Sequence, residues 1–319
     1  MSQRIAIAIL DDYQNVALRS ADWSILGDVD IRVYNDHVDD RAKLAERLRP
    51  CAVICAMRER TPIDRVLLSQ LPDLRLIVST GKRNAAIDVE AARERGIVVC
   101  GAGGSSTAAP ELTWALLLAA ARRLPAEFEA MRAGRWQTTI GRDLSQSTLA
   151  LLGLGGIGQV MARYGQAFGM EVIAWSENLD EKRAAAAGAR RVEKDELFRL
   201  GDFISVHLRL SPRTRGLVDA RALSLMKPDA ILINTSRGPI VDEAALIDAL
   251  RNHRIGAAAL DTFDIEPLPK DHPFRALDNV VATGHVGYVT AGSYRAYYGE
   301  TVENIRAWLD GHPIHIMES

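Results

Sequence analysis

Residues 148–177 read TLALLGLGGIGQVMARYGQAFGMEVIAWSE, and this stretch sets the architecture of the whole chain. A short apolar run up to Leu152 is followed by glycines at the spacing G-x-G-x-x-G. Apolar side chains then recur at helical period, and a second apolar run up to Trp175 closes the stretch. The order of strand, glycine turn, helix and strand predicts a βαβ unit that binds a dinucleotide.

Each residue of the turn has its own physical task. Gly153 permits the tight turn after the first strand, Gly155 lets the backbone approach a pyrophosphate, and Gly158 lets the helix lie close on the strand. Gly156 and Ile157 of the same turn are further expected cofactor contacts, and the N-terminal N–H groups of the helix that follows point at the anion. A purely structural glycine turn is the alternative.

Composition narrows the class of protein. At 319 residues the chain is too long for one ordinary core, so two domains are expected. A net charge of −2 gives no reason to expect nucleic acid or an anionic membrane as a partner. Three cysteines in apolar runs form no paired metal motif, which predicts buried thiols. The absence of a signal-peptide pattern and of a long apolar run predicts a cytoplasmic protein.

Strand and helix signals alternate on both sides of the glycine turn. The expected fold class is α/β with two doubly wound parallel-sheet domains. In it, a Rossmann dinucleotide-binding domain of residues 104–292 is inserted in a discontinuous, flavodoxin-like substrate domain of residues 1–103 and 293–319. The small-residue segment 101–107 marks the first boundary. The last helix, over residues 293–309, is expected to return to the first domain.

The segment before the glycine turn has a different character. Residues 110–124 predict a strongly apolar helix that Pro125 ends. Residues 126–147 carry Phe128 and Trp136 among mixed charges without a clear period. This composition predicts an arm that packs on another surface, such as a second subunit.

Three predicted strand ends downstream carry polar side chains. Arg237 follows a strand over residues 230–234, Glu266 follows the next strand, and His285 follows the last. Ligands of open α/β sheets lie beyond the carboxyl ends of the strands. Each residue alone has an ordinary explanation as an ion pair, a loop residue or a structural histidine. Their coincidence beside a dinucleotide site predicts a catalytic set.

The segments GLGGIG at 153–158, NTSRGPIVDEAAL at 234–246, ALDTFDIEPLP at 259–269 and His285-x-Gly287 resemble the D-isomer-specific 2-hydroxyacid dehydrogenase family, over essentially the whole chain. The resemblance implies hydride transfer between NAD(P)H and C2 of a small 2-oxo or 2-hydroxy acid. It implies that Arg237 holds the substrate carboxylate and polarises the C2 oxygen. His285 would protonate that oxygen, and Glu266 would orient His285 and favour its protonated form.

The resemblance also implies further contacts, and it implies no metal. Asp261 would accept a hydrogen bond from the nicotinamide carboxamide. The other expected cofactor contacts outside the glycine turn are Ser176, His207, Thr214 and Thr235. The expected substrate contacts are Arg58, Gly81, Lys82 and Arg83. Lys82 and Arg83 replace smaller residues of the family, and they predict either a solvated cationic loop or a second grip on a carboxylate or phosphate.

The choice between the two nicotinamide cofactors depends on Ser176. The family often has an acidic residue there, which grips the ribose 2′-hydroxyl. Recognition of a 2′-phosphate normally needs a nearby arginine, whereas the nearest cations in sequence are Lys182-Arg183 and Glu177 would repel the phosphate. The sequence therefore favours NAD(H), with NADP(H) as the alternative.

Other functions on this scaffold stay open. A cofactor-sensing interaction protein would have the same fold, and so would a phosphite-type anion dehydrogenase. The formate-oxidising branch is expected to have Gln at position 266, where this chain has Glu. The resemblance also implies a homodimer, with residues 107–147 at the contact.

Overall fold

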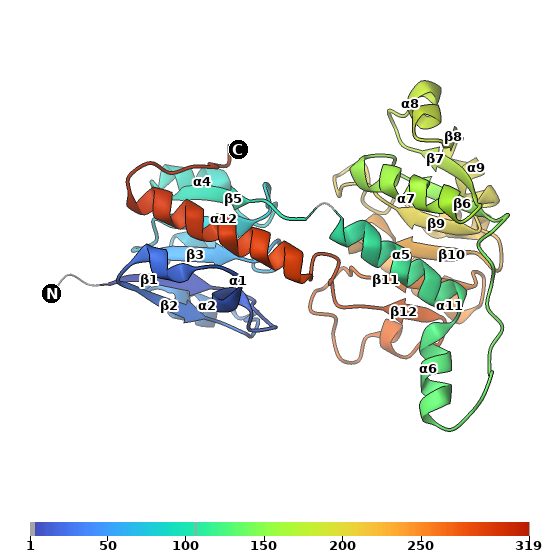
Figure 1. The fold of residues 1–319 in the computed structure, drawn as a ribbon, viewed down its shortest axis with the longest axis horizontal. Helices are drawn as coiled ribbons and strands as arrows, with labels where there is room; N and C mark the ends of the chain where they lie inside the picture. The colour runs from blue at the N-terminus through green and yellow to red at the C-terminus, as the bar shows by residue number, and fades with distance from the viewer. Residues whose placement is uncertain (1–3, 106, 319) are drawn as a thin grey trace. The chain divides into compact units, whose positions relative to one another are not determined.

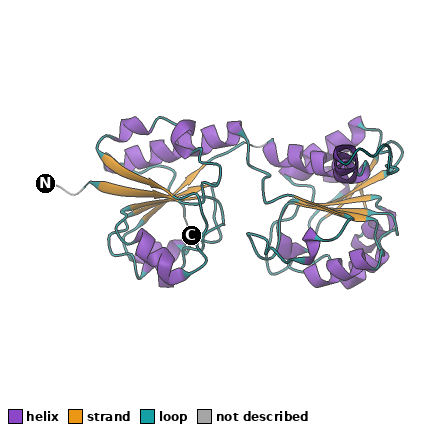
Figure 2. Ribbon diagram, turned by 90° about the horizontal axis from the view of Figure 1, so that it is seen from below, coloured by secondary structure: helices purple, strands orange, loops and turns teal. Residues whose placement is uncertain are grey.

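The computed structural model describes residues 4–105 and 107–318. The chain forms two compact units, one of Met1–Ser105 with Tyr288–Ser319 and one of Ser106–Gly287, which we call unit 1 and unit 2. Each unit has one sheet with helices on both of its faces (Figure 2). The predicted fold class, with two doubly wound parallel sheets, is confirmed. Ser106 of the expected boundary segment, and residues 1–3 and 319 of the expected first domain, lie outside the described residues.

Unit 1 has a five-stranded parallel sheet in the order β2-β1-β3-β4-β5, which is the flavodoxin-like order. Its strands are β1 (Ile5–Ile9), β2 (Val29–Val33), β3 (Val53–Ala56), β4 (Leu76–Thr80) and β5 (Val98–Ala102). Its helices are α1 (Ala17–Ser20), η1 (Trp23–Leu26), α2 (Arg41–Leu48), α3 (Arg65–Leu68), α4 (Val89–Glu94) and α12 (Ala291–Leu309). The inner strands β3 and β4 are buried along their whole length, as parallel strands covered on both faces must be.

Helix α12 belongs to unit 1, although it follows unit 2 in the chain (Figure 1). It packs on β4 and β5, and its Tyr298 is fully buried in a core with Cys55 and Val78. The chain behind α12 then pairs antiparallel with β5, where the amide of Met317 donates to the carbonyl of Val99 at 2.8 Å. The last segment therefore covers an edge of the sheet that would otherwise be open.

Unit 2 has a seven-stranded parallel sheet in the order β12-β11-β10-β9-β6-β7-β8. Its strands are β6 (Thr148–Leu152), β7 (Glu171–Trp175), β8 (Arg190–Arg191), β9 (Phe203–Val206), β10 (Ile231–Asn234), β11 (Ala257–Leu260) and β12 (Val280–Ala282). Its helices are α5 (Ala108–Ala121), α6 (Leu124–Arg132), α7 (Gly156–Ala167), α8 (Glu181–Ala186), α9 (Lys194–Leu200), α10 (Ala220–Leu225), η2 (Gly238–Ile240), α11 (Glu243–Arg251) and η3 (Pro273–Arg275). The strand order reverses between β6 and β9, so the glycine turn lies at the topological switch point.

The helix expected over residues 110–124 needs a correction. Helix α5 ends at Ala121, and Arg123 adopts a left-handed backbone with φ of +52°. Pro125 lies in the first turn of α6, where the N–H that proline lacks has no helical partner in any case. Pro125 therefore begins a helix instead of ending one, and the first part of the expected arm is helical.

Among the described residues, no helix combines the length and the apolarity that crossing a membrane requires.

Candidate active site

The glycine turn connects β6 to α7 at close range. Gly153 has φ of +109°, and a Cβ there would lie 2.7 Å from the carbonyl oxygen of His207. A Cβ on Gly158 would overlap the carbonyl group of Gly153. Both positions therefore require glycine for the helix and the strands to pack as they do.

Gly155 and Gly156 are different, because a Cβ at either would meet no atom within 4 Å. Gly155 is the N-cap of α7 and has no side chain to accept from the first-turn N–H groups. Open space and unsatisfied donors at a helix N-terminus suit a pyrophosphate. The residues present therefore fit a dinucleotide at this turn.

The other expected cofactor contacts lie in loops that follow neighbouring strands. Ser176 follows β7, and together with Thr214 it lines one pocket of about 430 Å³. Thr235 follows β10, and its hydroxyl lies 2.6 Å from that of Thr113 on α5. His207 follows β9, with Nε2 2.8 Å from Oγ of Ser205. Desolvation lowers the pKa of His207 to about 4, so the ring is neutral at pH 7.

The three proposed catalytic residues follow three adjacent strands of one sheet, namely β10, β11 and β12. Arg237 is held by its neighbours, because the side chain of Asn234 donates to the carbonyl of Arg237 at 2.9 Å and accepts from the amide of Ser236 at 3.0 Å. The Arg237 guanidinium donates to the Ser236 carbonyl at 2.7 Å. The loop that carries this cation is therefore shaped by its own side chains.

Glu266 and His285 form a pair. Oε2 of Glu266 lies 2.5 Å from Nδ1 of His285, and Oε1 accepts from the amide of Phe263 at 2.9 Å. Both side chains are mostly shielded, with 27% and 17% of their surface exposed. His285 has a left-handed backbone, with φ of +54°, a conformation that non-glycine residues adopt rarely and mostly where the surroundings impose it.

Asp261 makes several of the contacts that hold the loop around His285. It is fully buried, and it accepts from the hydroxyl of Thr283 at 2.6 Å and from the amides of Val286 and Gly287 at 2.8 and 2.9 Å. Burial raises the pKa of Asp261, while these hydrogen bonds act to lower it. The carboxylate therefore clamps the loop on both sides of His285. The carboxamide contact expected of Asp261 stays a prediction.

Thr283 was not expected from the sequence as part of this arrangement. Its only signal is its place at the end of β12, two residues before His285. Asn234 was likewise considered only as the last residue of a strand and the first residue of the segment 234–246. A threonine or an asparagine at the end of a strand does not by itself indicate a positioning role, and the partner of Thr283 lies in another loop.

The four expected substrate contacts lie together in unit 1. The amide of Arg58 donates to Oγ1 of Thr80 at 2.9 Å, and the Arg58 guanidinium lies against Gly81, where it would overlap a Cβ. Lys82 and Arg83 follow directly and are exposed. The sequence did not point to Arg60 in this group, whose guanidinium lies 4.6 Å from the ring centre of Tyr13. Arg58, Lys82 and Arg83 bring positive charge to this part of unit 1, beside Glu59, whose Oε2 lies 3.8 Å from Nε of Arg58.

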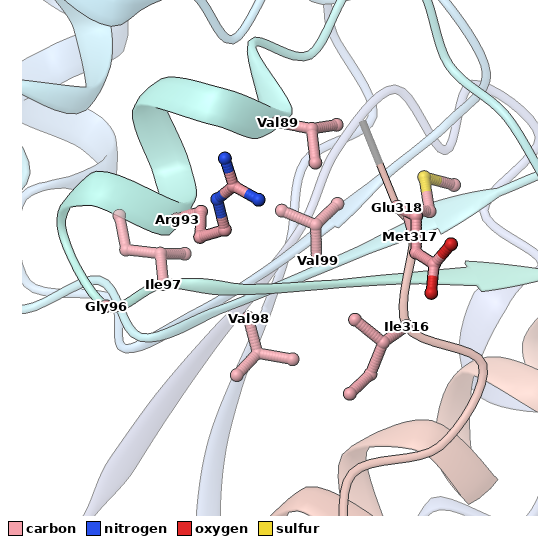
Figure 3. Close-up of a pocket in the computed structure, with 9 residues that line it drawn as sticks. All are labelled: Val89, Arg93, Gly96, Ile97, Val98, Val99, Ile316, Met317 and Glu318. Atoms are coloured by element: carbon pink, nitrogen blue, oxygen red, sulfur yellow. The ribbon is translucent and has the colours of Figure 1, made fainter.

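A pocket of about 590 Å³ elsewhere in unit 1 makes a poor candidate for the site. It lies between α4, the beginning of β5 and the last segment of the chain (Figure 3). Its lining is mainly apolar, with Arg93 and Glu318 as the charged members. It is at the amino end of β5, opposite to the end where sheets of this type bind ligands. Among the described residues, no group of His, Cys, Asp and Glu side chains has the arrangement of a metal site.

Comparison with known proteins shows the family to which the chain is similar. A family model described as "D-isomer specific 2-hydroxyacid dehydrogenase, NAD binding domain" matches residues 114–287. The D-3-phosphoglycerate dehydrogenase of Methanocaldococcus jannaschii is 37% identical over 275 residues, which are 85% of this chain and 52% of that protein. This chain thus spans about half the length of that relative.

Two further proteins are similar over more of their own length. The glyoxylate reductase of Aeropyrum pernix is 40% identical over 259 residues, 78% of this chain and 77% of that protein. The solved structure of a phosphoglycerate oxidoreductase from Vibrio cholerae O395 superimposes with a TM-score of 0.92 at 40% identity, covering 96% of this chain and 99% of that one.

Proposed function

Because the chain belongs to the D-isomer-specific 2-hydroxyacid dehydrogenase family, we propose that it transfers a hydride between NAD(P)H and C2 of a small 2-oxo or 2-hydroxy acid. The observation that carries the proposal is the 2.5 Å contact between Glu266 and His285. Their loops follow β11 and β12, and Arg237 follows β10, so the three residues follow consecutive strands of one sheet. A protein that only bound a dinucleotide would need none of these three side chains.

The roles follow from the chemistry of each group. Arg237 binds the substrate carboxylate, since a guanidinium presents paired donors to a planar anion and stays charged at every working pH. His285 gives its Nε2 proton to the C2 oxygen in the reducing direction and takes it back in the oxidising direction. Glu266 holds Nδ1, so it fixes the ring and stabilises the imidazolium. When bound at the glycine turn, the nicotinamide cofactor supplies the hydride or accepts it.

The substrate class is a small 2-oxo acid and its D-2-hydroxy acid. Two of the relatives are named for phosphoglycerate and glyoxylate, which differ in whether a second anionic group is present. Arg58, Gly81, Lys82 and Arg83 are the proposed substrate contacts of unit 1. Their charge favours an acid with a second anionic group over glyoxylate.

The test follows the loss of absorbance of the reduced nicotinamide, at ~340 nm, when the protein is mixed with NADH or NADPH. A panel of 2-oxo acids is tested, each with both cofactors. Turnover by the wild type, and a loss of about 100-fold or more in kcat/KM for Arg237→Ala and His285→Ala, is the expected result. Arg251→Ala and His253→Ala change exposed residues of the same unit and serve as matched controls.

Two outcomes would contradict the proposal. Unchanged turnover in Arg237→Ala or His285→Ala would remove those residues from the chemistry. Binding of both cofactors with no reduction of any acid would favour the cofactor-sensing alternative, and oxidation of phosphite alone would favour the anion dehydrogenase.

We also propose that the protein is a homodimer. The segment formed by α6 and the chain behind it exposes large apolar side chains, with exposed fractions of 58% for Phe128, 57% for Met131, 73% for Trp136 and 92% for Ile140. Several large apolar side chains exposed within one segment are typical of a protein contact. A second copy of the chain is the partner that the family resemblance favours.

A further inference from the structure

The pocket that contains Ser176 and Thr214 lies where the ends of β7 and β9 flank β6. Because β6 leads into the glycine turn, this pocket is on the side of the dinucleotide site where a Rossmann fold holds the adenosine ribose. One wall comes from Trp175, Ser176 and Glu177, and the other from the loop of residues 208–217. All of these residues belong to unit 2.

Three arginines line this pocket, namely Arg183, Arg209 and Arg213. All three are exposed, and among the described residues none of them forms an ion pair with a carboxylate. Arg183 is held over the turn after β7, since its Nη1 donates to the carbonyl of Asn178 at 3.0 Å. Glu177 is the one carboxylate in the lining, so the pocket keeps an excess of positive charge.

The loop that carries two of the arginines is tied together internally. Oγ1 of Thr214 accepts from the amide of Ser211 at 2.8 Å and donates to the carbonyl of Arg209 at 2.6 Å. The hydroxyl of Ser236 donates to the carbonyl of Leu208 at 2.5 Å. The backbone at Arg209 is therefore held on both sides, and less conformational entropy is lost when its guanidinium binds an anion.

Ser176 adds a hydroxyl donor to the arginines of this pocket. A carboxylate at this position would accept from the ribose hydroxyls and repel a phosphate, whereas a serine hydroxyl can donate to a phosphate oxygen. Guanidinium groups are the side chains best suited to a phosphate dianion, because they stay charged and donate in pairs. Three of them outweigh the repulsion from Glu177.

We propose that this pocket receives the 2′-phosphate of NADP(H), with Ser176, Arg183, Arg209 and Arg213 as the residues that select it over NAD(H). The inference deepens the proposed function only in naming which dinucleotide binds. The sequence favoured NAD(H) because Lys182-Arg183 were the nearest cations in the chain. The fold adds Arg209 and Arg213, which belong to a loop after a different strand.

The test measures binding and needs no turnover. Dissociation constants of NADPH and NADH are taken from the fluorescence of the reduced nicotinamide, and those of 2′,5′-ADP and 5′-AMP from competition. The expected result is that the phosphorylated member of each pair binds about 10- to 100-fold more tightly, as one or two charge-assisted contacts would give. The double variant Arg209→Gln with Arg213→Gln should lose that preference and keep its NADH affinity within about twofold.

Ser176→Asp should reverse the preference, because it restores an acceptor for the ribose and a charge that repels the phosphate. Arg215→Gln is the matched control, since Arg215 is an exposed arginine of the same loop that does not line the pocket. It should leave both affinities unchanged.

The proposal is overturned if the wild type binds NADH as tightly as NADPH, or if the double variant weakens both cofactors equally. Failure of the proposed function looks different, because the preference for NADPH would persist while no 2-oxo acid is reduced. Circular dichroism of each variant confirms that it is folded, so that a lost preference reports on the pocket.

Discussion

At the scale of single residues, the charge of Glu266 should support proton transfer by His285. Glu266→Gln keeps the size of the side chain and an oxygen that can face Nδ1 of His285, but it removes the charge that favours the imidazolium. We expect kcat/KM for reduction to fall about 10- to 100-fold, within the usual range for general acid catalysis.

A second His–Glu pair in unit 2 provides the control. Nε2 of His272 lies 3.1 Å from Oε1 of Glu243 at the beginning of α11. Glu243→Gln should leave kcat/KM for reduction unchanged and cost at most about 1 kcal/mol of stability, as expected for an acidic residue in a first helical turn. If both variants lower kcat/KM alike, the effect of Glu266 comes from its charge in general and not from its contact with His285.

His37 should make the stability of the protein, and not its activity, depend on pH. Its Nδ1 lies 2.9 Å from Asp11, and this hydrogen bond is the main cause that raises the pKa of His37 above 6.5 in the folded protein. The raised pKa stabilises the fold below the unfolded value near 6.5, and this contribution is lost as pH rises through the folded pKa. Thermal unfolding between pH 5.5 and 8.5 should therefore show stability falling across the upper half of that range.

In His37→Gln this fall should become shallower, with a cost at pH 6 of about 1 kcal/mol, after allowing for solvent screening of the partly exposed pair. His253→Gln changes an exposed loop histidine and should leave the slope intact. An equal slope in wild type and His37→Gln would assign the pH dependence to other groups.

At the scale of elements, two glycines of one turn should respond differently to the same substitution. Gly155→Ala places its methyl in open space, so the melting temperature should stay within about 2 °C while dinucleotide affinity falls about tenfold or more. Gly158→Ala forces α7 away from Gly153, so it should lower the melting temperature by several degrees and weaken binding as well. Calorimetry and cofactor titration of both variants separate the two effects, and equal loss of stability would refute the distinction.

Comparing the predicted with the observed strands and helices shows which elements a local sequence pattern can identify. The ends of β6 and β7 and the span of β10 were foreseen to within one residue, because buried parallel strands are apolar along most of their length. The end of α5 was not, since Pro125 serves equally well as a stop and as the first turn of α6. The short elements α8, β8 and α10 were also absent from the prediction, because runs of two to six residues carry no measurable period.

The candidate site likewise contains residues that the sequence could identify and residues that it could not. Arg237, Glu266 and His285 were identified because each follows an apolar strand, and parallel strands end at a common edge. Arg209 and Arg213 were not connected to Ser176, because the link between them is the order of β7, β6 and β9 in the sheet. The spacing of residues along the chain contains no information on that order.

At the scale of the whole molecule, the exposed arm predicts self-association. In size-exclusion chromatography with light scattering, the wild type should have the mass of a dimer. The double variant Trp136→Ser with Ile140→Ser should raise the dimer dissociation constant at least tenfold, because both residues are among the most exposed apolar side chains. Val66→Ser, an exposed apolar residue of unit 1, is the matched control and should stay dimeric. A monomeric wild type at micromolar concentration would show that another partner covers the arm.

The insertion of unit 2 between β5 and α12 also has a consequence for biosynthesis. The strands of unit 1 leave the ribosome first, but Tyr298 and its neighbours on α12, which complete their core, follow roughly 200 residues later. At ~5–20 residues per second that delay is roughly 10 to 40 s. Unit 2 can therefore close its core while unit 1 waits with one face of its sheet uncovered, and it is this nascent half that would need a chaperone.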